Sequence, residues 1–599
     1  MDGGPSVNPT TCAGDVRQRL CLSLALLVAL VAALPLLVGP GIVNTRAGGD
    51  SPFLIQRVQG LAQNLRAGVW VARWMPDGAY GLGYPFYMFY ASLPYYLAAG
   101  LHLMGWGLLW SIKLTQAFGF LLAGLAMYLL ARRLGARPVA ALLSSCVYTC
   151  APFHLVNVYV RGDALSEFYA LALYPLVLWA ATEVLLRPRV DRMALLAVSY
   201  ALLAVCHNIS VLVFSPLLTL WLLVGALGRG GERWRAMGVG AAGLAFGLAL
   251  SVWFWAPALR EQSLVQLQDQ TTGYFFYANH FLRGNLVQLA PVHNYTIDEQ
   301  RTPFSMGLVQ AGVAAVGLVG GLAAAFRQRV RAETGRDEAW SHWATAVASA
   351  ALLGYTWLMT PSSQWVWAHL PLLPMVQFPW RLLGVQALAV AVLAARLPAL
   401  YRERMWPSLA IAALCVVAGL GGLRIDRLPI TDADVSSSSL MLYETWSGNI
   451  GSTVRHEYLP RDMQPRPYTS AVQLAGASKP APLALEGSLG EAVLLASHPE
   501  REEWRIIAAT PVLLAFHTTF YPGWEATVDG VPQGVEPLVG LGQIGLRVPP
   551  GEHSVVLRFE GTPTRRYTLW GSLAAAEVLL GLLAWHCVRR LRASSRKVD

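Results

Sequence analysis

The chain has 599 residues, of which 55% are hydrophobic and only 13% are charged. Soluble domains carry about 25% charged residues, so this composition excludes an ordinary soluble domain and predicts a polytopic α-helical membrane protein. The net charge of +10 comes almost entirely from arginine. The arginines cluster in short loops between apolar runs, which is the orientation pattern of a membrane protein rather than a nucleic-acid-binding surface.

Apolar runs near the length that crosses a bilayer recur along the whole chain. We expect about 12 transmembrane helices, near residues 20–42, 108–131, 138–157, 164–186, 191–208, 209–228, 235–257, 305–325, 341–360, 378–397, 404–423 and 568–590. Residues 85–105 are also apolar, but two prolines interrupt them, and a span there would reverse the side of every later loop. We therefore expect a surface-lying or re-entrant helix at 85–105.

The arginine-rich loops all fall on one side of the membrane, which the positive-inside rule identifies as the cytoplasm. They hold Arg17 and Arg19, Arg132, Arg133 and Arg137, Arg187, Arg189 and Arg192, Arg229, Arg233 and Arg235, Arg327, Arg329, Arg331 and Arg336, Arg402 and Arg404, and Arg589, Arg590 and Arg592. Both termini then lie inside. The first outer loop (43–107), the loop 258–304 and the segment 424–566 lie outside.

The first outer loop carries the most informative acidic residue, Asp50. Apolar residues recur at helical spacing from Leu54 to Leu65 directly after it, with polar residues on the other face, which predicts a helix lying on the membrane surface. A carboxylate held there is well placed to take a proton from a water-soluble acceptor. The alternative is that Asp50 caps the helix starting at Ser51–Pro52.

Further ionisable groups collect at the outer membrane face, where one apolar run ends and the next begins. Arg161, Asp163 and Glu167 belong to the sequence YVRGDALSEF. Asp163 and Glu167 are four residues apart and share a helix face, with Glu167 about one turn deeper. A carboxylate at that depth is costly unless it is paired or functional, so the alternatives are a functional group and an Arg161–Glu167 ion pair that closes the turn.

Two cationic side chains enter the apolar zone from the same side. Arg381 is about one turn inside its span, where a guanidinium suits a phosphate, and Lys113 enters the second span at a similar level. The alternative for both is snorkelling to the lipid headgroups. His207 and Asn208, at the outer end of a short span, are candidate supporting polar residues.

The outer loop 258–304 is aromatic and predicts a lid or a substrate groove. Its candidate residues for the acceptor are Tyr277, His280, Arg283 and His293. The histidines lack the close spacing of a metal site, so we assign no metal. A P-loop and a nucleophile elbow are also missing from the sequence, and no cofactor is expected.

The 424–566 segment differs in character from the rest of the chain. Short alternating runs at 512–516, 525–528 and 554–559 are separated by turns rich in Pro, Gly and Asp, which predicts an extracytoplasmic β-sandwich. The expected organisation is therefore a membrane domain (1–423), a β-rich domain (424–566), and a last transmembrane helix with a basic cytoplasmic tail (567–599). No cysteine lies in 424–566, so no disulfide framework is expected there.

Several motifs together resemble a bacterial family of membrane proteins described as 6-pyruvoyl-tetrahydropterin synthase-related. They are GDSPFLIQRV, RWMPDGAYGLGYPFYMFYASLPYYLAAGLHLMG, YVRGDALSEFYALALYP, CHN, QFPWR and FYPGWEATVDG. The order of features is also similar to the GT-C superfamily of membrane glycosyltransferases, which have an Asp after the first span, two surface helices in the first outer loop and a periplasmic C-terminal domain. The resemblance implies a GT-C-like fold, with Asp50 at the position of the catalytic base, in the bacterial plasma membrane.

The leading hypothesis from these features is a glycosyltransferase that moves a sugar from a polyprenyl-phosphate-linked donor to an extracytoplasmic glycan, lipid or protein. Asp50 is its candidate base, and Arg161, Arg381 and Lys113 are its candidate donor-phosphate ligands. Two alternatives remain open. One is a transporter or flippase for a lipid-linked glycan, and the other is a non-catalytic envelope scaffold whose β-domain binds polysaccharide.

Overall fold

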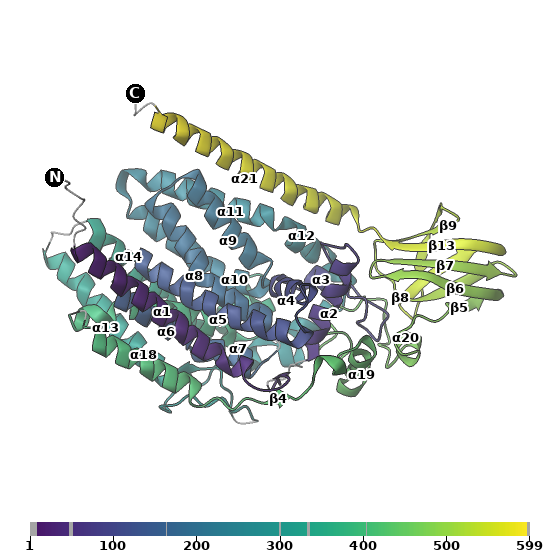
Figure 1. The fold of residues 1–599 in the computed structure, drawn as a ribbon, viewed down its shortest axis with the longest axis horizontal. Helices are drawn as coiled ribbons and strands as arrows, with labels where there is room; N and C mark the ends of the chain where they lie inside the picture. Colours follow the sequence, from purple (N-terminus) through teal and green to yellow (C-terminus); the bar gives the residue numbers. More distant parts are fainter. Residues whose placement is uncertain are drawn as a thin grey trace, which may run out of the picture.

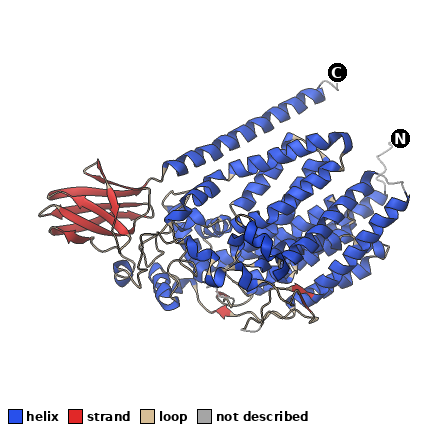
Figure 2. Ribbon diagram, turned by 180° about the vertical axis from the view of Figure 1, so that it is seen from behind, coloured by secondary structure: helices blue, strands red, loops and turns tan. Residues whose placement is uncertain are grey.

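The protein is a helical bundle with a β-sandwich at one end, seen in a computed structural model that describes residues 9–46, 52–162, 164–298, 301–331, 336–402 and 404–595. In Figure 1 both termini lie at the end of the bundle that is farther from the sandwich. Figure 2 shows that nearly all strands gather in the sandwich, while the rest of the chain is helical or irregular. The predicted helical protein with a C-terminal β-rich region is therefore confirmed.

The helices of the described residues follow one another along the chain, most of them with short connections. Their bounds are α1 (Pro9–Leu37), α2 (Pro52–Arg66), α3 (Phe86–Phe89), α4 (Leu93–Leu103), α5 (Leu108–Arg133), α6 (Pro138–Thr149), α7 (Pro152–Tyr159), α8 (Leu165–Leu186), α9 (Val190–Ala204), α10 (Asn208–Leu227), α11 (Arg233–Leu250), α12 (Val252–Glu261), α13 (Leu308–Arg331), α14 (Arg336–Leu358), α15 (Gln364–His369), α16 (Leu383–Ala394), α17 (Leu397–Leu400), α18 (Met405–Leu420), α19 (Ser437–Ser447), α20 (Ala471–Leu474) and α21 (Pro563–Ser595).

Among the described residues, 6 helices are long and apolar enough to cross a membrane, or up to 8 if two bent helix pairs each form one span. The bent pairs are α6 with α7 and α11 with α12. Helices occupy the other expected spans too, but α9 has 15 residues and α18 has 16, which is short of the roughly 20 that cross a bilayer. The expected number of about 12 spans stays a prediction.

Helix α2 forms where the sequence predicts it, but both of its faces are covered by protein. Leu54, Val58 and Leu61 are buried in the main core, and Gln56 and Arg57 on the polar face are buried as well. The polar face lies against the chain that follows α18, so it does not face water or lipid headgroups as expected. The reason is polar pairing: Gln56 Nε2 donates to Glu444 Oε1 of α19 (3.3 Å).

The apolar run at 85–105 is divided into α3 and α4, and neither is long enough to cross a membrane. The 11 residues of α4 span about 16 Å at 1.5 Å per residue, against a hydrocarbon core of about 30 Å. Both helices lie beside α2 at the sandwich end of the bundle in Figure 1. This arrangement fits a non-spanning segment.

The sandwich has a five-stranded sheet of order β10-β9-β13-β7-β6 and a four-stranded sheet of order β11-β12-β8-β5, within the fully described stretch 483–559. Its strands are β5 (Leu483–Glu486), β6 (Leu489–His498), β7 (Arg501–Ala508), β8 (Val512–Thr519), β9 (Trp524–Val528), β10 (Val531–Gln533), β11 (Val535–Pro537), β12 (Gln543–Val548) and β13 (Gly551–Phe559). The predicted strand runs lie in β8, β9 and β13. Asp529 and Gly530 join β9 to β10 with φ of 52° and 79°, as a tight hairpin turn requires.

The first part of the predicted β-rich segment is not sheet. Apart from β4 (Arg427–Leu428), which pairs with β1 (Ile42–Val43), the described residues between 424 and 482 form α19, α20 and irregular chain. The remaining short pair, β2 (Val287–Gln288) with β3 (Met306–Gly307), lies in and after the outer loop 258–304. The segment before the sandwich therefore packs on the bundle and contributes to its outer end.

The sandwich is packed onto the bundle through an apolar cluster and a buried ion pair. Trp74 of the first outer loop lies edge-on to Trp524 of β9, with ring centroids 5.3 Å apart. At the start of α21, Arg565 Nη2 is 2.7 Å from Glu261 Oε2 of α12, and both side chains are less than a tenth exposed. Tyr521 also donates to Glu261 (3.2 Å). These contacts fix the sandwich against the helices.

Candidate functional site

A cavity of about 560 Å³ lies at the end of the bundle that is nearer the sandwich, between the helices and the chain segments that pack on them. Its walls come from segments far apart in the sequence. They are α2, the end of α3, the turn between α7 and α8, the start of α10, the outer loop 258–304, the chain before α16, and residues 453–458. Cationic, acidic and aromatic side chains all face this space.

Arg161 and Glu167 form the centre of the charged wall. Helix α7 ends at Tyr159, and Gly162, with φ of 58°, turns the chain towards α8. This turn brings Arg161 Nη1 to 2.6 Å from Glu167 Oε2 and 2.5 Å from Asn157 Oδ1. The Arg161–Glu167 ion pair that the sequence offered as an alternative is therefore present, and it lines the cavity.

Arg381 approaches the same carboxylate from another part of the chain. It lies in a short 3-10 helix (Pro379–Leu382) that leads into α16, and its Nε is 3.6 Å from Glu167 Oε2. Its Nη1 donates to the carbonyl oxygen of Val376 (3.1 Å). One carboxylate thus lies between two guanidinium groups, which leaves a net positive charge at this wall. Trp380 lies against the Arg161 guanidinium, 5.0 Å from ring centroid to Cζ.

Three further predicted residues, His207, Asn208 and His280, also line the cavity. His207 precedes α10 and its Nδ1 is 2.7 Å from Ser210 Oγ. The ring of His280 packs against Phe378, with centroids 4.7 Å apart. The cavity therefore brings together six of the predicted residues, Arg161, Glu167, Arg381, His207, Asn208 and His280.

Lys113 lies away from the cavity, so the structure does not support it as a phosphate ligand there. Its Nζ donates to the carbonyl oxygen of Gly39 (3.1 Å) and lies 5.0 Å from the ring of Trp110. It lies on the face of α5 that meets the chain after α1. The sequence pattern did not indicate this facing direction.

Three predicted residues of the outer loop also lie outside the lining of the cavity. Tyr277 stacks on Trp367 (5.3 Å between centroids), His293 packs on Tyr295 (4.7 Å), and Arg283 is exposed. The loop still contributes Tyr274, Phe275 and Asn279 to the wall. Asp50 and Asp163 lie outside the described residues.

Arg57 is a lining residue that the sequence analysis treated only as part of a polar helix face. Its guanidinium lies between aromatic rings, the nearest being Tyr90 at 4.5 Å. It donates to Tyr95 Oη (2.9 Å) and to the carbonyl oxygen of Ser452 (2.6 Å). Arg57 therefore joins α2 to residues 449–463, which we call the covering segment, and adds a third cation to those described for the lining.

Glu457 is a second lining residue that the sequence analysis did not select. It belongs to the covering segment, and its Oε2 is buried without a hydrogen-bond partner among the residues that the structure describes. Burial raises the pKa of this carboxyl above its usual value, while the positive charge of Arg57 acts in the opposite direction. No local sequence pattern around Glu457 and Tyr458 indicates that this segment packs on the bundle.

The described residues contain no group of three or more His, Cys, Asp or Glu side chains that could hold a metal ion. The cysteines Cys21, Cys146, Cys150, Cys206 and Cys415 are free and buried. The lining of the cavity instead offers guanidinium groups, carboxyls, imidazoles and aromatic rings. Such a site suits a ligand that has an anionic group next to a part that carries hydroxyls or packs on aromatic rings.

The fold and the cavity define a helical membrane protein with a site at the end of its bundle. Residues 87–429 match a family model described as 6-pyruvoyl-tetrahydropterin synthase related domain; membrane protein. The match covers more than half of the chain, so the chain belongs to this family. A search of curated proteins found no match.

Solved structures of several membrane enzymes show a limited likeness to the chain. The arabinofuranosyltransferase AftD from Mycobacteria is 17% identical with a TM-score of 0.42, over 68% of this chain and 27% of that one. The Archaeoglobus fulgidus oligosaccharyltransferase AglB, in complex with an inhibitory peptide and a dolichol-phosphate, is 13% identical with a TM-score of 0.40, over 68% of this chain and 55% of that one. An apo form of the A. fulgidus oligosaccharyltransferase is 13% identical with a TM-score of 0.40, over 76% of this chain and 60% of that one. This chain spans only part of each of these proteins.

Proposed function

We propose that this protein is a membrane glycosyltransferase that moves a sugar from a polyprenyl-phosphate-linked donor to an extracytoplasmic acceptor. The observation that carries the proposal is the cavity of about 560 Å³ at the end of the bundle, where the guanidinium groups of Arg57, Arg161 and Arg381 lie beside carboxyls and aromatic rings. A lipid-linked donor needs a phosphate-binding wall next to a space for its sugar. The lining of this cavity supplies both.

The phosphate of the donor is proposed to bind at Arg161 and Arg381. A guanidinium carries five N–H donors in a planar fork, a geometry that matches two phosphate oxygens at once. Two such groups at one wall of the cavity would stabilise the charge that develops on the leaving phosphate. Since Lys113 lies elsewhere, it is not part of this proposal.

Asp50 is proposed as the base that takes the proton of the acceptor hydroxyl. As the acceptor oxygen bonds to the anomeric carbon, the carbon–oxygen bond to phosphate breaks, the proton passes to the carboxylate, and polyprenyl phosphate leaves. Described residues before and after Asp50 support this role. The Arg46 amide donates to the carbonyl oxygen of Val160 (2.8 Å), next to Arg161, and Phe53 lines the cavity.

Turnover of a labelled donor tests the proposed function. Protein reconstituted in liposomes should release polyprenyl phosphate from at least one member of a panel of polyprenyl-phosphate-linked hexoses and pentoses when acceptor glycans from the same cell envelope are added. The Arg381→Ala protein should lose this release, and the control Arg260→Ala, at an exposed arginine of α12 outside the lining of the cavity, should keep it. Movement of the labelled lipid across the bilayer without release would instead identify a flippase. The absence of both release and movement would favour the non-catalytic binding scaffold.

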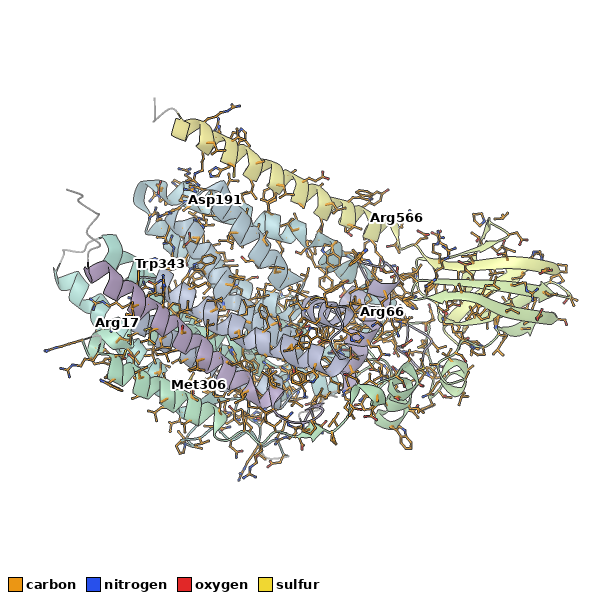
Figure 3. The ribbon with its side chains drawn as sticks, viewed as in Figure 1. Arg17, Arg66, Asp191, Met306, Trp343 and Arg566 are labelled. Carbon is orange, nitrogen blue, oxygen red and sulfur yellow. The ribbon has the colours of Figure 1, made fainter. Side chains whose placement is uncertain are left out.

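The proposed reaction takes place outside the plasma membrane, with both termini in the cytoplasm. Figure 3 shows Arg17 near the end of the bundle that holds both termini, and Arg66 and Arg566 near the sandwich. Single cysteines placed at two exposed glycines should report this orientation. In a protein whose exposed Cys587 is replaced by Ser, we expect a membrane-impermeant maleimide to label Gly534→Cys in intact cells and to label Gly231→Cys only after the cells are opened. The reverse pattern would contradict the orientation and the side of the proposed reaction.

A further inference from the structure

The covering segment contributes Thr453, Val454, Glu457 and Tyr458 to the wall of the cavity, and hydrogen bonds fasten it to other parts of the protein at both ends. The carbonyl oxygen of Ser452 accepts from Arg57 Nη2 (2.6 Å), and the Ser452 amide donates to Tyr84 Oη (3.0 Å). At the other end, the Gln266 amide donates to the carbonyl oxygen of Leu459 (3.1 Å) and the Arg461 amide to that of Leu264 (2.9 Å). The residues between these anchors are therefore held in a fixed position over the cavity.

Two polar side chains between the anchors, Thr453 and Glu457, line the cavity side by side. The Thr453 hydroxyl acts on the Glu457 carboxyl as a hydrogen-bond donor that lowers its pKa. Oε2 of Glu457 is buried and has no hydrogen-bond partner within the geometric limits of a hydrogen bond in the part of the chain that the structure describes. A ligand hydroxyl that donates into the cavity would satisfy this oxygen atom and lie within reach of the Thr453 hydroxyl.

Aromatic rings lie next to these oxygen atoms. Tyr458 follows Glu457 and is held by stacking on Phe89 of α3, with centroids 5.7 Å apart and an interplanar angle of 8°. Tyr90 also lines the cavity, and its ring centroid is 6.4 Å from that of Tyr458. An aromatic ring offers a flat apolar surface to the C–H face of a sugar, while a carboxyl and a hydroxyl bind its ring hydroxyls.

We propose that Glu457 and Thr453 bind ring hydroxyls of a saccharide in this cavity, with Tyr458 and Tyr90 lining the same space. This inference rests on the proposed function and adds to it the residues that recognise the sugar. The covering segment supplies this saccharide-binding wall, and the turn before α8 with the chain before α16 supplies the phosphate-binding wall. The sugar is that of the lipid-linked donor or that of an acceptor glycan, since the chemistry of the hydroxyls is shared.

Binding measurements on the full-length protein in nanodiscs test this inference. The probes are bare undecaprenyl phosphate, undecaprenyl-phosphate-linked mannose, glucose and galactose, and an array of soluble microbial oligosaccharides. The variants are Glu457→Gln, which keeps the size of the side chain, Glu457→Ala and Thr453→Val. Glu525→Gln, an exposed glutamate of β9, is the matched control.

Recognition of the donor sugar predicts that the Glu457 variants lose about tenfold or more in affinity for a glycosylated lipid, while their Kd for bare undecaprenyl phosphate stays unchanged. Recognition of the acceptor predicts the same loss for a soluble oligosaccharide and none for the lipids. Either result supports the inference, and the control should match the parent protein throughout. The thermal unfolding midpoint of each variant shows that it is folded.

Two results would overturn the inference. In one, the parent protein binds no glycosylated lipid more tightly than the bare lipid phosphate and binds no oligosaccharide. In the other, folded Glu457 variants bind every saccharide as the parent does. A failure of the proposed function gives a different result. In that case the parent protein does not bind bare undecaprenyl phosphate, or binds it independently of Arg381, while the oligosaccharide measurements still test the inference.

Discussion

The Asp50→Asn protein should transfer sugar about 100-fold more slowly than the parent, or worse, while it still binds polyprenyl phosphate. Asparagine keeps the size of the side chain and most of its hydrogen bonds, but it cannot take the proton of the acceptor hydroxyl. The loss should therefore fall on the chemical step and not on donor binding. Single-turnover release of polyprenyl phosphate, measured at saturating donor, separates the two.

The matched control for this substitution is Asp462→Asn, which changes an exposed aspartate of the covering segment. This protein should keep the parent rate. An Asp50→Asn protein that also keeps the parent rate would show that Asp50 only caps α2, the alternative that the sequence left open. An equal loss of donor binding and of transfer would place Asp50 in the binding of the donor instead.

The sequence predicts the helical wall of the cavity well because depth in a membrane is readable from hydropathy. The ends of apolar runs place Arg161, Glu167 and Arg381 at one level, and the arginine-rich loops place that level on one side. A shared level allows such groups to meet, and the facing directions of their helices decide whether they do. Their meeting at Glu167 Oε2, 2.6 Å from Arg161 and 3.6 Å from Arg381, shows that these three do.

Hydropathy does not predict which way a side chain faces. It also does not predict which distant segment of the chain packs on the bundle. Lys113 was expected to face the site, but it turns to the carbonyl oxygen of Gly39, because α5 packs that face on α1. Glu457 reaches the cavity because its segment pairs with Gln266 and Arg57, which are about 190 and 400 residues away in the chain. Such pairing depends on tertiary contacts that no local pattern encodes.

Turn chemistry explains why the sandwich was easier to predict than the segment before it. The hairpin at Asp529-Gly530 needs positive φ at both residues, which these residue types tolerate, so the sequence itself marks the turn. In contrast, α19 and the irregular chain around it are held by side chains of the first outer loop. Glu444 accepts from the amides of Ala79 (3.2 Å) and Tyr80 (2.5 Å), more than 360 residues away.

Replacement of Arg381 by Lys should raise the Kd for bare polyprenyl phosphate about tenfold, even though the charge is kept. Lysine loses the planar fork, so it cannot donate to Val376 and present parallel donors to a phosphate at the same time. The matched control is Arg396→Lys, a largely buried arginine that bonds Thr345 and lies outside the lining of the cavity. Equal Kd values for the two variants would leave Arg381 as a structural residue.

Glu167→Gln should lower the Kd for polyprenyl phosphate, whereas Arg381→Lys should raise it. The carboxylate between Arg161 and Arg381 occupies donors that a phosphate would use, so removal of its charge should tighten the binding of polyprenyl phosphate by roughly fivefold. The unfolding free energy should fall by about 3–5 kcal/mol without ligand, because two guanidinium groups lose their buried partner, and the ligand should restore part of it. Differential scanning fluorimetry with and without polyprenyl phosphate measures both effects. Weaker binding by Glu167→Gln would mean that Glu167 itself contacts the ligand and that the two arginines are held for structure alone.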